Sequence, residues 1–411
     1  MNILFLAQDV TPSARSGDAV HLRELVINLN ALGHSVIVIG RDLEGVSEID
    51  YSNYQKVLDG ISNDTLKFVL LKTRFKLSFP PMKLLHTLVE AMKVLGNNRI
   101  DLIYSRSFNC WLEVFLSQLS GVPLVLEING LEQDEAELMG KRLPSPVPKR
   151  LRTAANVFLF RFPSGIITVT DMLRKILVNE YSISQEIISV VPNGANTELF
   201  KPLDQLESKM KLGLDLNKRY ICYMGSLEPW QGIEYLIMSF PGILGTINSA
   251  TLLIVGGGLL RKKLEVLSGE LGIRDKIVFT GSVPYTEVPT YINASDVCVA
   301  PFTHTRNEKI GLSALKIYEY LACGKSIVAS DIKGVGDLLT ETNTGIAVKP
   351  EDVNELAKAI IELLSNEKLR TEMGKRGVKV VMERHNWKLA TDSVYDILKK
   401  ACERYRQRDS H

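Results

Sequence analysis

The chain has 411 residues, which at roughly 150 residues per domain corresponds to two or three domains. Hydrophobic residues make up 45% of the sequence and charged residues 23%, a globular balance that excludes disordered, collagen-like and disulfide-framework proteins. The 49 Lys and Arg residues nearly balance the 47 Asp and Glu residues, and the net charge of +2 indicates no nucleic acid among the partners. Five scattered cysteines without a CxxC pair favour reduced thiols in a cytoplasmic protein.

No segment has the length and composition of a membrane anchor. The first ten residues, MNILFLAQDV, contain a short apolar run with no basic region before it, which predicts a buried first strand rather than a signal peptide. No run approaches the roughly 20 apolar residues that span a bilayer. We therefore expect a cytoplasmic protein that is at most attached peripherally to the inner face of the plasma membrane.

In the first half of the chain, short apolar runs alternate with amphipathic helices. A helix is expected to begin near Asp18. Its buried face has the i, i+3, i+4, i+7 spacing and consists of Leu22, Leu25, Val26 and Leu29. The expected strands cover residues 3–7, 35–40, 101–105, 122–128, 165–170 and 187–192. Continuous apolar runs of this kind are typical of parallel strands that are covered on both faces.

A second round of the same alternation begins at residue 219. Its expected strands cover residues 219–225, 251–257, 276–281, 296–302, 326–331 and 344–350. A final helix is expected from about Trp387, and its apolar contacts are Leu389, Val394, Leu398 and Ala401. The two rounds predict an α/β fold with two doubly wound domains that face each other, and the turn residues between 192 and 212 place the junction there.

Open parallel sheets bind ligands beyond the carboxyl ends of their strands, where helix N-termini favour phosphate. Two glycine-containing loops of the second half have this position. The first is YMGSLEPWQG, in which Gly225 follows a strand and Gly232 opens a helix. The second is VGGGLLRKKLEVL, in which Arg261 lies in the first turn of a helix. This second loop lacks the G-x-G-x-x-G spacing of a dinucleotide site, so that a tight structural turn is the alternative interpretation of its glycines.

The segment NEKIGLSALKIYEYLACGKSIVASD (307–331) is expected to form a loop, a helix over about residues 312–322, a glycine turn and a strand. On this helix, Ser313, Lys316 and Glu319 fall at i, i+3 and i+6. A Lys–Glu pair at this spacing is often a solvated surface pair. The apolar neighbours of the pair instead favour a position in the cleft between the domains, where the lysine would hold an anion and the glutamate a vicinal diol.

With these motifs, the sequence resembles the retaining glycosyltransferases of the GT-B fold, of the group 1 and family 4 type. The resemblance covers most of the chain, and its motifs stand in the family's order. They are SGDAVHLRELVINLNALGHSVIVIG, VVPNGANTELFKP, YMGSLEPWQGIEYLI, VGGGLLRKKLE, FTGSVPYTEVPTYINASDVCVAPF and GLSALKIYEYLACGKSIVAS. The resemblance implies two Rossmann-like domains across a deep cleft: residues 1–195 on the acceptor side and residues 196–386 on the donor side. The helix of about 387–411 would pack back on the first domain.

The resemblance also implies which residues hold the donor. Glu319 matches a glutamate that holds ribose hydroxyls, Gly17 matches a glycine that admits the donor phosphate, and residues 280–284 match the region beside the nucleobase. Asn193 and Gly194 match an interdomain turn, for which a structural hinge is the alternative. The residues expected to bind the donor are Gly17, Gly225, Ser226, Gln231, Gly232, Arg261, Ser282, Val283, Ser313, Leu315, Lys316 and Glu319.

The sequence departs from the family pattern in three places. Gly311 stands where the first glutamate of the paired motif usually contacts the donor sugar. Ser226 and Gln231 stand where the family has its diphosphate-binding Arg and Lys. We expect Lys316 to take over the neutralisation of the diphosphate. The position of the usual acceptor-side histidine, after the fifth strand, is taken by Glu127 or Asn129.

The implied reaction transfers a glycosyl group from a UDP- or GDP-sugar to a hydroxyl, with retained anomeric configuration and without a bound metal or other cofactor. No nucleophile is named; His21 is a candidate near the cleft, with a structural role as the alternative. Gly311 also admits a non-catalytic or weakly active sugar-nucleotide binding protein, and the same scaffold admits a sugar-nucleotide epimerase or a phosphorylase. A nicotinamide oxidoreductase is disfavoured, because neither half has a complete dinucleotide fingerprint.

The acceptor implied by the resemblance is a glycan, a glycolipid, a lipid-linked saccharide or a precursor of a cell-surface polysaccharide. Residues 72–85 and 141–162 combine basic and aromatic side chains, which favours attachment to an anionic membrane surface. A solvated loop followed by a core helix is the alternative interpretation of each segment.

Overall fold

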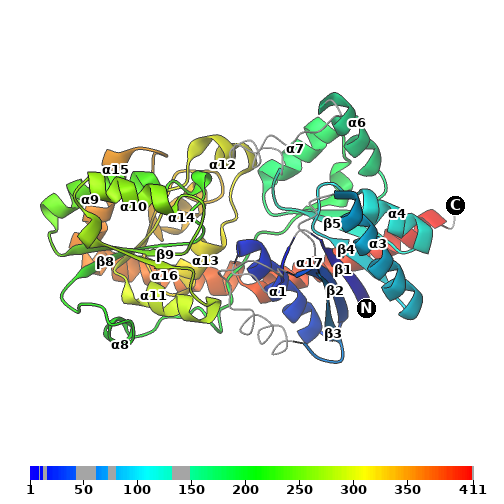
Figure 1. Cartoon of the computed structure of the whole chain (residues 1–411), viewed down its shortest axis with the longest axis horizontal. Coiled ribbons are helices and arrows are strands. Elements are labelled where there is room, and N and C mark those ends of the chain that lie inside the picture. The colour runs from blue at the N-terminus through cyan, green and yellow to red at the C-terminus, as the bar shows by residue number, and fades with distance from the viewer. Residues whose placement is uncertain (9, 13–15, 43–61, 73–79, 132–148, 410–411) are drawn as a thin grey trace. The chain divides into compact units, whose positions relative to one another are not determined.

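The computed structural model describes residues 1–8, 10–12, 16–42, 62–72, 80–131 and 149–409. These residues form two compact units, each built around one sheet (Figure 1). Unit 1 contains the described residues of Met1–Glu132, Leu143–Val191 and Ala390–His411, and the described part of unit 2 is Pro192–Leu389. Among the described residues, no helix combines the length and the apolar character needed to cross a membrane.

Unit 1 has a seven-stranded parallel sheet in the order β3-β2-β1-β4-β5-β6-β7. The strands are β1 (Asn2–Ala7), β2 (Ser35–Asp42), β3 (Leu66–Lys72), β4 (Leu102–Ser105), β5 (Leu124–Ile128), β6 (Gly165–Thr168) and β7 (Ile188–Val190). All of them except β3 lie on predicted apolar runs. The prediction missed β3 because this strand lies at the sheet edge and contains Lys67 and Lys72, whereas continuous apolar runs mark strands that are covered on both faces.

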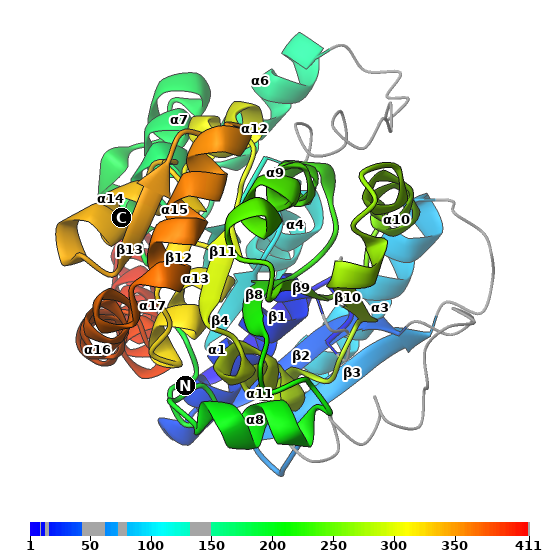
Figure 2. The ribbon, with the colours of Figure 1, turned by 90° about the vertical axis from the view of Figure 1, so that its left-hand side faces the viewer.

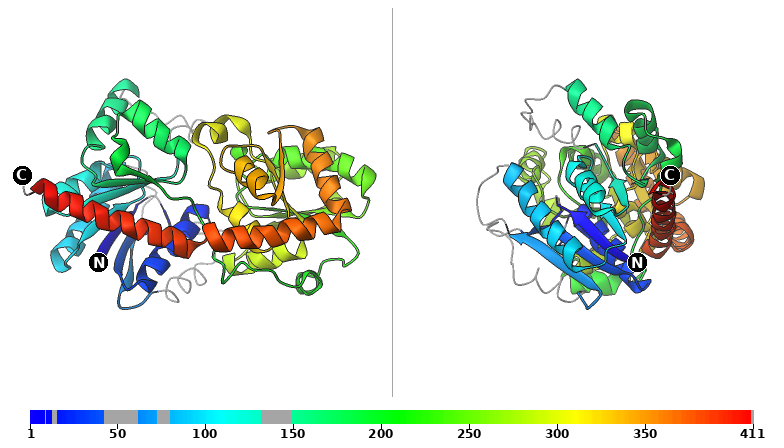
Figure 3. Two further views of the ribbon diagram at one scale, coloured as in Figure 1. Left: turned by 180° about the vertical axis from the view of Figure 1, so that it is seen from behind. Right: turned by 90° about the vertical axis from the view of Figure 1, so that its right-hand side faces the viewer.

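Helices cover both faces of this sheet. They are α1 (Gly17–Ala31), α3 (Pro80–Asn97), α4 (Trp111–Ser120), α6 (Lys149–Leu159), α7 (Asp171–Tyr181), the short η1 (Gln185–Ile187) and α17 (Trp387–Asp409). The predicted face of α1 is buried in one core with Val394, Leu398 and Ala401 of α17 and with β1. Leu389 was also predicted as a contact, but its side chain is exposed. On the opposite face of the sheet, α3 and α4 lie side by side (Figures 1 and 3).

Unit 2 has a six-stranded parallel sheet in the order β10-β9-β8-β11-β12-β13 (Figure 2). The strands are β8 (Arg219–Met224), β9 (Ala250–Val255), β10 (Ile277–Gly281), β11 (Val297–Ala300), β12 (Ile327–Ser330) and β13 (Gly345–Val348). Each of these strands confirms a predicted run. Two doubly wound parallel sheets confirm the predicted α/β fold class.

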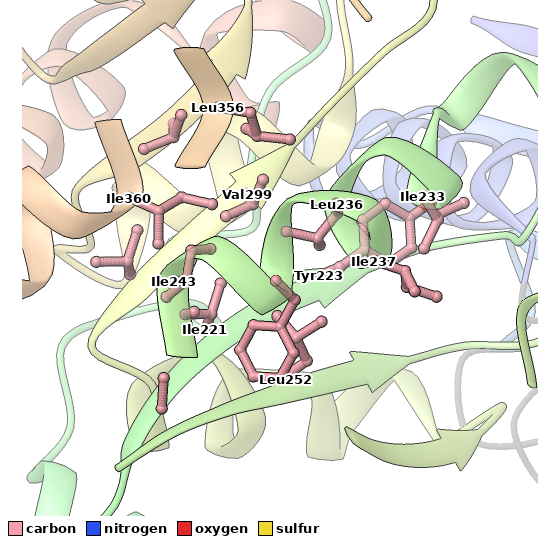
Figure 4. Close-up of a cluster of buried hydrophobic side chains, with 14 of the residues drawn as sticks. Ile221, Tyr223, Ile233, Leu236, Ile237, Ile243, Leu252, Val299, Leu356 and Ile360 are labelled. Carbon is pink, nitrogen blue, oxygen red and sulfur yellow. The ribbon is translucent and has the colours of Figure 1, made fainter. Parts of the chain in front are cut away.

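The helices of unit 2 complete a buried core on either side of this sheet. They are α8 (Gln205–Lys211), α9 (Ile233–Thr246), α10 (Arg261–Glu270), α11 (Val288–Ala294), α12 (His304–Ile310), α13 (Leu315–Ala322), α14 (Gly336–Thr342), α15 (Val353–Ser365), α16 (Glu367–Arg384) and the short η2 (Pro229–Gln231), η3 (Arg274–Lys276) and η4 (Tyr285–Glu287). Figure 4 shows one core, in which Leu236 of α9 and Ile360 of α15 pack with Ile221 of β8 and Val299 of β11. This packing holds the loops at the carboxyl ends of the strands on a rigid base.

The helix predicted over residues 312–322 begins later than expected. α12 ends at Ile310, and Gly311 then adopts a φ of 65°, which favours glycine. Ala314 is extended, with φ −79° and ψ 119°, and α13 begins only at Leu315. Ser313 therefore lies in the link before the helix and does not share a helix face with Lys316 and Glu319.

Candidate functional site

In unit 2, the loop after β8 and the first turn of α13 meet around one ammonium group. The Nζ of Lys316 donates hydrogen bonds to the Gln231 Oε1 at 2.7 Å and to the Tyr223 hydroxyl at 3.1 Å. It also lies 4.2 Å from the ring centre of Tyr223 and 5.3 Å from that of Phe302. The structure thus brings together Lys316 and Gln231, two of the predicted donor-binding residues that lie far apart in the sequence.

Burial makes the charged form of this lysine costly. The side chain of Lys316 is almost fully buried, and desolvation lowers its pKa to about 7, although the nearby Glu319 charge opposes the shift. Its direct contacts are neutral oxygens and aromatic rings, which only partly replace the lost hydration. An anion placed beside this ammonium would therefore stabilise its charged form strongly.

Gly225 leaves the space that the ammonium occupies. Its φ is 136°, and a Cβ atom at this position would lie 2.7 Å from the Nζ of Lys316. Gly232 has a different role, because a Cβ atom there would collide with the carbonyl oxygen of Pro301. The requirement for glycine at 225 thus concerns the candidate site, whereas the requirement at 232 concerns backbone packing.

The glycine run after β9 packs against the same loop. Cβ atoms at Gly256 and Gly258 would collide with the backbone of Gly225 and of Leu227, respectively. A Cβ atom at Gly257 would lie 2.9 Å from the Ser282 Oγ. These contacts fit the tight-turn interpretation of the run. Ser282 itself is exposed, and Val283 is partly buried against the core.

Arg261 and Ser226 are two further residues that were predicted to bind the donor. The guanidinium of Arg261 pairs with Glu265 at 2.7 Å on α10 and stacks over the ring of Phe279, 4.6 Å from its centre. Ser226 is exposed, and its carbonyl oxygen accepts a hydrogen bond from the Tyr223 hydroxyl at 2.7 Å. The Arg261 contacts do not include the Lys316 ammonium, whereas Ser226 is linked to it through the Tyr223 hydroxyl, which also accepts a hydrogen bond from the Lys316 Nζ.

Glu319 is buried one turn after Lys316. Its Oε1 accepts a hydrogen bond from the Tyr285 hydroxyl at 2.9 Å. The same helix carries Tyr320, whose hydroxyl oxygen accepts the N–H of Met224 at 2.7 Å and ties α13 to the end of β8. Leu315, the first residue of α13, is partly buried. Tyr285 was not predicted, although it directly follows the TGSVP stretch that was assigned to the nucleobase.

Ser313 holds the turn that contains Asn193. Its Oγ accepts the Asn193 backbone N–H at 2.8 Å, its carbonyl oxygen accepts from the Asn193 Nδ2 at 2.6 Å, and its hydroxyl lies 3.2 Å from that of Tyr318. A Cβ atom at Gly194 would collide with the backbone of Asn386. These contacts support the structural interpretation of the Asn193–Gly194 turn.

A second cluster of buried polar groups lies in unit 1, around the carboxylate of Glu127 at the end of β5. Glu127 Oε1 pairs with the His21 Nε2 at 2.8 Å and the Arg106 Nε at 3.5 Å, and it accepts the Asn129 Nδ2 at 2.6 Å. Its Oε2 accepts the Tyr104 hydroxyl at 2.5 Å. Three predicted residues, Glu127, Asn129 and His21, are thus in direct contact.

The partners of Glu127 reverse the effect of burial. Burial alone raises the pKa of this carboxyl, but the charges of His21 and Arg106 and the hydrogen bonds from His21 and Tyr104 hold the pKa well below its usual range. The carboxylate is therefore ionised, and its acceptor capacity is filled by protein donors. This arrangement orients His21 and Arg106 and leaves the carboxylate poorly suited to act as a base.

The N-terminus of α1 is tied to the same cluster. Gly17 is the first residue of α1, and the Ser16 hydroxyl accepts the Ala19 N–H at 3.4 Å. Arg106 Nη1 donates to the carbonyl oxygen of Asp18 at 2.8 Å. Tyr104 and Arg106 were not predicted. The sequence LIYSR carried a signal for them, because Tyr104 lies near the end of a predicted strand and Arg106 directly follows it, at the carboxyl edge of the sheet.

In the part of the chain that the structure describes, no three or more His, Cys, Asp or Glu residues are grouped so that they could hold a metal ion. Of the basic and aromatic segments, residues 73–79 and 141–148 lie outside the described residues.

Two family descriptions together match most of the chain. "Glycosyl transferases group 1" matches residues 204–380, and "Glycosyltransferase Family 4" matches residues 15–199. The first match covers the Lys316 cluster, and the second covers the Glu127 cluster.

One relative and two solved structures match nearly the whole chain. An uncharacterized glycosyltransferase of Methanocaldococcus jannaschii is 26% identical over 98% of this chain and 99% of its own length. The structure of a sucrose-phosphate synthase from Thermosynechococcus elongatus has a TM-score of 0.76 at 20% identity, over 100% of this chain and 99% of that one. The structure of HepE from Anabaena in complex with UDP and glucose has a TM-score of 0.75 at 18% identity, over 97% and 99%. The likeness to the solved structures shows the fold.

Proposed function

Because the chain belongs to the group 1 and family 4 glycosyltransferases and has their GT-B fold, we propose that it is a retaining enzyme whose donor is a UDP- or GDP-sugar. The acceptor in this proposal is a hydroxyl of a glycan, a glycolipid or a lipid-linked saccharide. Unit 2 holds the donor and unit 1 holds the acceptor. All five cysteines are free and buried, which supports a reducing, cytoplasmic location.

The buried Lys316 ammonium is the observation that carries the donor assignment. It lies against Gln231 and Gly225, in the loop where the sequence lacks the cations expected for a diphosphate. Its charge is poorly compensated by its neutral contacts, so a diphosphate beside it would gain charge-assisted hydrogen bonds. In this proposal Lys316 stabilises the leaving diphosphate, and no metal ion is required.

Glu319 and Tyr285 complete the donor site in this proposal. A buried carboxylate accepts hydrogen bonds from vicinal hydroxyls, and Glu319 lies one helical turn from the diphosphate-binding lysine. The ribose of the donor would therefore replace or join the Tyr285 hydroxyl as a donor to Glu319.

On the acceptor side, we assign no nucleophile. Glu127 is occupied by the donors of Tyr104, Asn129 and His21 and by the nearby charge of Arg106, so its role in this proposal is to orient His21 and Arg106. His21 remains the candidate for a direct contact with substrate.

The experiment that tests the proposal measures the thermal midpoint and the affinity with UDP, GDP, UDP-glucose and GDP-mannose. A donor that binds the folded protein raises the midpoint. We expect Lys316→Met to weaken nucleotide binding by about 10- to 100-fold, the loss of one or two charge-assisted hydrogen bonds. Lys325→Met is the matched control, because Lys325 is a partly buried lysine of the same unit whose Nζ donates to two backbone carbonyls. Equal affinity in the wild type and Lys316→Met would contradict the donor assignment.

A second candidate function is a sugar-nucleotide binding protein without turnover. It is favoured by Gly311, which ends α12 with a positive φ and offers no side chain to the sugar. A protein of this kind would bind the nucleotide through Lys316 but would release no nucleoside diphosphate when it is mixed with a sugar nucleotide and a cell extract that contains acceptors. Release of the nucleoside diphosphate above the rate of donor hydrolysis distinguishes the two functions.

A further inference from the structure

The exposed apolar side chains of unit 1 concentrate on two neighbouring helices. Most of the large apolar residues that are exposed in the described part of this unit lie on α3 and α4. Single exposed apolar residues are common on proteins, but a cluster of them on neighbouring helices marks a surface that binds a partner. The apolar face of unit 1 consists of Leu85, Val89, Met92, Trp111, Phe115 and Leu119.

The outward side of α4 is apolar and carries no charge. Trp111, Phe115 and Leu119 follow one another at i, i+4 and i+8 and are 55%, 53% and 57% exposed. The other exposed residues of the helix are polar but uncharged, and its one charged residue, Glu113, is fully buried. The helix therefore presents a neutral stripe of large side chains to its surroundings.

α3 adds a second apolar stripe to that of α4. Leu85, Val89 and Met92 follow one another at i, i+4 and i+7 and are 53%, 42% and 41% exposed. α3 packs directly against α4 (Figure 1). The two stripes thus belong to neighbouring helices on the same side of the sheet of unit 1.

The charges beside the apolar face are paired. The Nζ of Lys93 lies 2.7 Å from the Oε1 of Glu90, and His86 is the one other ionisable side chain described on α3. In a dimer of identical copies each surface is opposed to itself, so that an excess of one charge would repel its own copy. The paired charges avoid this repulsion, whereas an anionic bilayer or a strongly charged protein would gain little attraction from them.

The area of the apolar face is sufficient for a dimer. A half-exposed aromatic or aliphatic side chain keeps about 60 to 140 Å² in contact with water, so the six side chains from each of two copies would bury on the order of 1,000 Å² together. A specific protein–protein interface needs about 1,000 Å² in total. The apolar side chains alone therefore reach the lower limit, and the polar residues at the rim would add to the buried area.

We propose that the apolar face binds the same face of a second copy of this chain, in a two-fold dimer anchored by Trp111 and Phe115. Large aromatic side chains in the centre of an interface contribute most of the binding energy of protein complexes. The apolar character of α4 and the paired charges of α3 both suit a neutral, identical partner. The inference does not rest on the proposed sugar transfer, since self-association is measured without donor or acceptor.

The test is sedimentation equilibrium of the full chain at protein concentrations up to about 100 μM, where the wild type should be dimeric. The triple variant Trp111→Ser, Phe115→Ser, Leu119→Ser should weaken the dimer at least about 100-fold, because two central anchors are lost from each copy. The folding of the variant is checked by its thermal midpoint. If the triple variant does not fold, Trp111→Ser alone takes its place and should weaken the dimer at least about tenfold.

Unit 2 offers a matched control. Leu203, Leu206 and Met210 on and before α8 are 43%, 55% and 61% exposed, and their triple replacement by Ser removes a similar apolar area. This control should dimerise like the wild type. A wild type that stays monomeric at the highest concentration would overturn the proposal, as would equal losses in both triple variants. A monomeric wild type that binds phospholipid vesicles, and loses this binding in the α4 variant, would assign the apolar face to lipid and also overturn it.

Discussion

Each unit contains a buried charged side chain at the carboxyl edge of its sheet, and the two charges are compensated differently. Glu127 in unit 1 contacts the cationic side chain of Arg106, His21 and two neutral donors, and its pKa is held well below the usual range. Lys316 in unit 2 directly contacts neutral oxygens and aromatic rings, and burial lowers its pKa to about 7. The compensated charge stabilises the fold, whereas the poorly compensated charge is available to an anionic ligand.

The largest expected effect is on stability and separates the two charges. Glu127→Gln keeps the side-chain shape but leaves His21 without its anion and Arg106 with only the exposed Asp18 carboxylate, so we expect a loss of about 3 kcal/mol in the free energy of unfolding. Lys316→Met, which removes a desolvated charge and keeps its volume, should leave stability unchanged or increase it. Thermal unfolding of the two variants beside the wild type measures the difference. Equal losses of stability in both variants would contradict the statement that the two charges are compensated differently.

The pKa values of both residues are lowered on folding, but the causes differ: partner charges lower that of Glu127, and burial lowers that of Lys316. The folded-state pKa of Glu127 lies below its unfolded value of about 4.5, so its contribution is complete above that pH and is lost as the pH falls further. The folded-state pKa of Lys316 also lies below its unfolded value of about 10.5, so the unfolded state binds the extra proton and stability rises from about pH 7 to 10.5. Unfolding across this alkaline range should show the rise in the wild type and lose it in Lys316→Met. A rise of equal size in both proteins would assign it to another group.

A somewhat smaller effect is expected on nucleotide affinity. Below about pH 7 Lys316 is already charged, whereas above it the binding of a diphosphate must be accompanied by the uptake of a proton. The affinity for UDP or GDP should therefore fall with rising pH, by up to about tenfold per unit for one linked proton. Calorimetry in two buffers of different ionisation enthalpy measures the proton directly. Binding without proton uptake at pH 8 would argue against a nucleotide phosphate beside Lys316.

The smallest effect concerns the second half of the donor site. Tyr285→Phe removes the hydroxyl that donates to the buried Glu319, so we expect a loss of about 1 kcal/mol in the free energy of unfolding without nucleotide. Bound nucleotide should restore part of this loss, because its ribose hydroxyls supply new donors to Glu319. Tyr291→Phe in the same unit serves as the control for removal of a phenol hydroxyl. A loss that nucleotide leaves unchanged would place the ribose elsewhere.

The strands of both sheets were largely predictable because continuous apolar runs are a local signal. Parallel strands that are covered on both faces carry this signal along their whole length, and twelve of the thirteen strands in the described residues lie on predicted runs. β3 was missed because an edge strand with Lys67 and Lys72 does not carry it. The start of α13 was misplaced for a related reason: the apolar spacing around Ser313 continues a helical pattern, but Gly311 has a positive φ and Ala314 is extended, so the helix begins only at Leu315.

The residues of the candidate sites were only partly predictable. The motif around Lys316 and Glu319 was visible in the sequence, but nothing local indicated that Tyr223 and Phe302 would enclose the ammonium. Arg261 looked available for a phosphate in the sequence, yet it pairs with Glu265 one turn away. Which charges are free and which are paired depends on neighbours that the chain brings together only on folding.

By itself, the sequence determined the α/β class, the two sheets and the position of most loops, because hydrophobic periodicity and glycine placement act over short distances. Only the tertiary structure decided that His21 and Glu127 form a filled ionic cluster and that Lys316 keeps a poorly compensated charge. The physical reason is that the energy of a buried charge or an apolar face depends on long-range packing, which sets its dielectric surroundings and its partners.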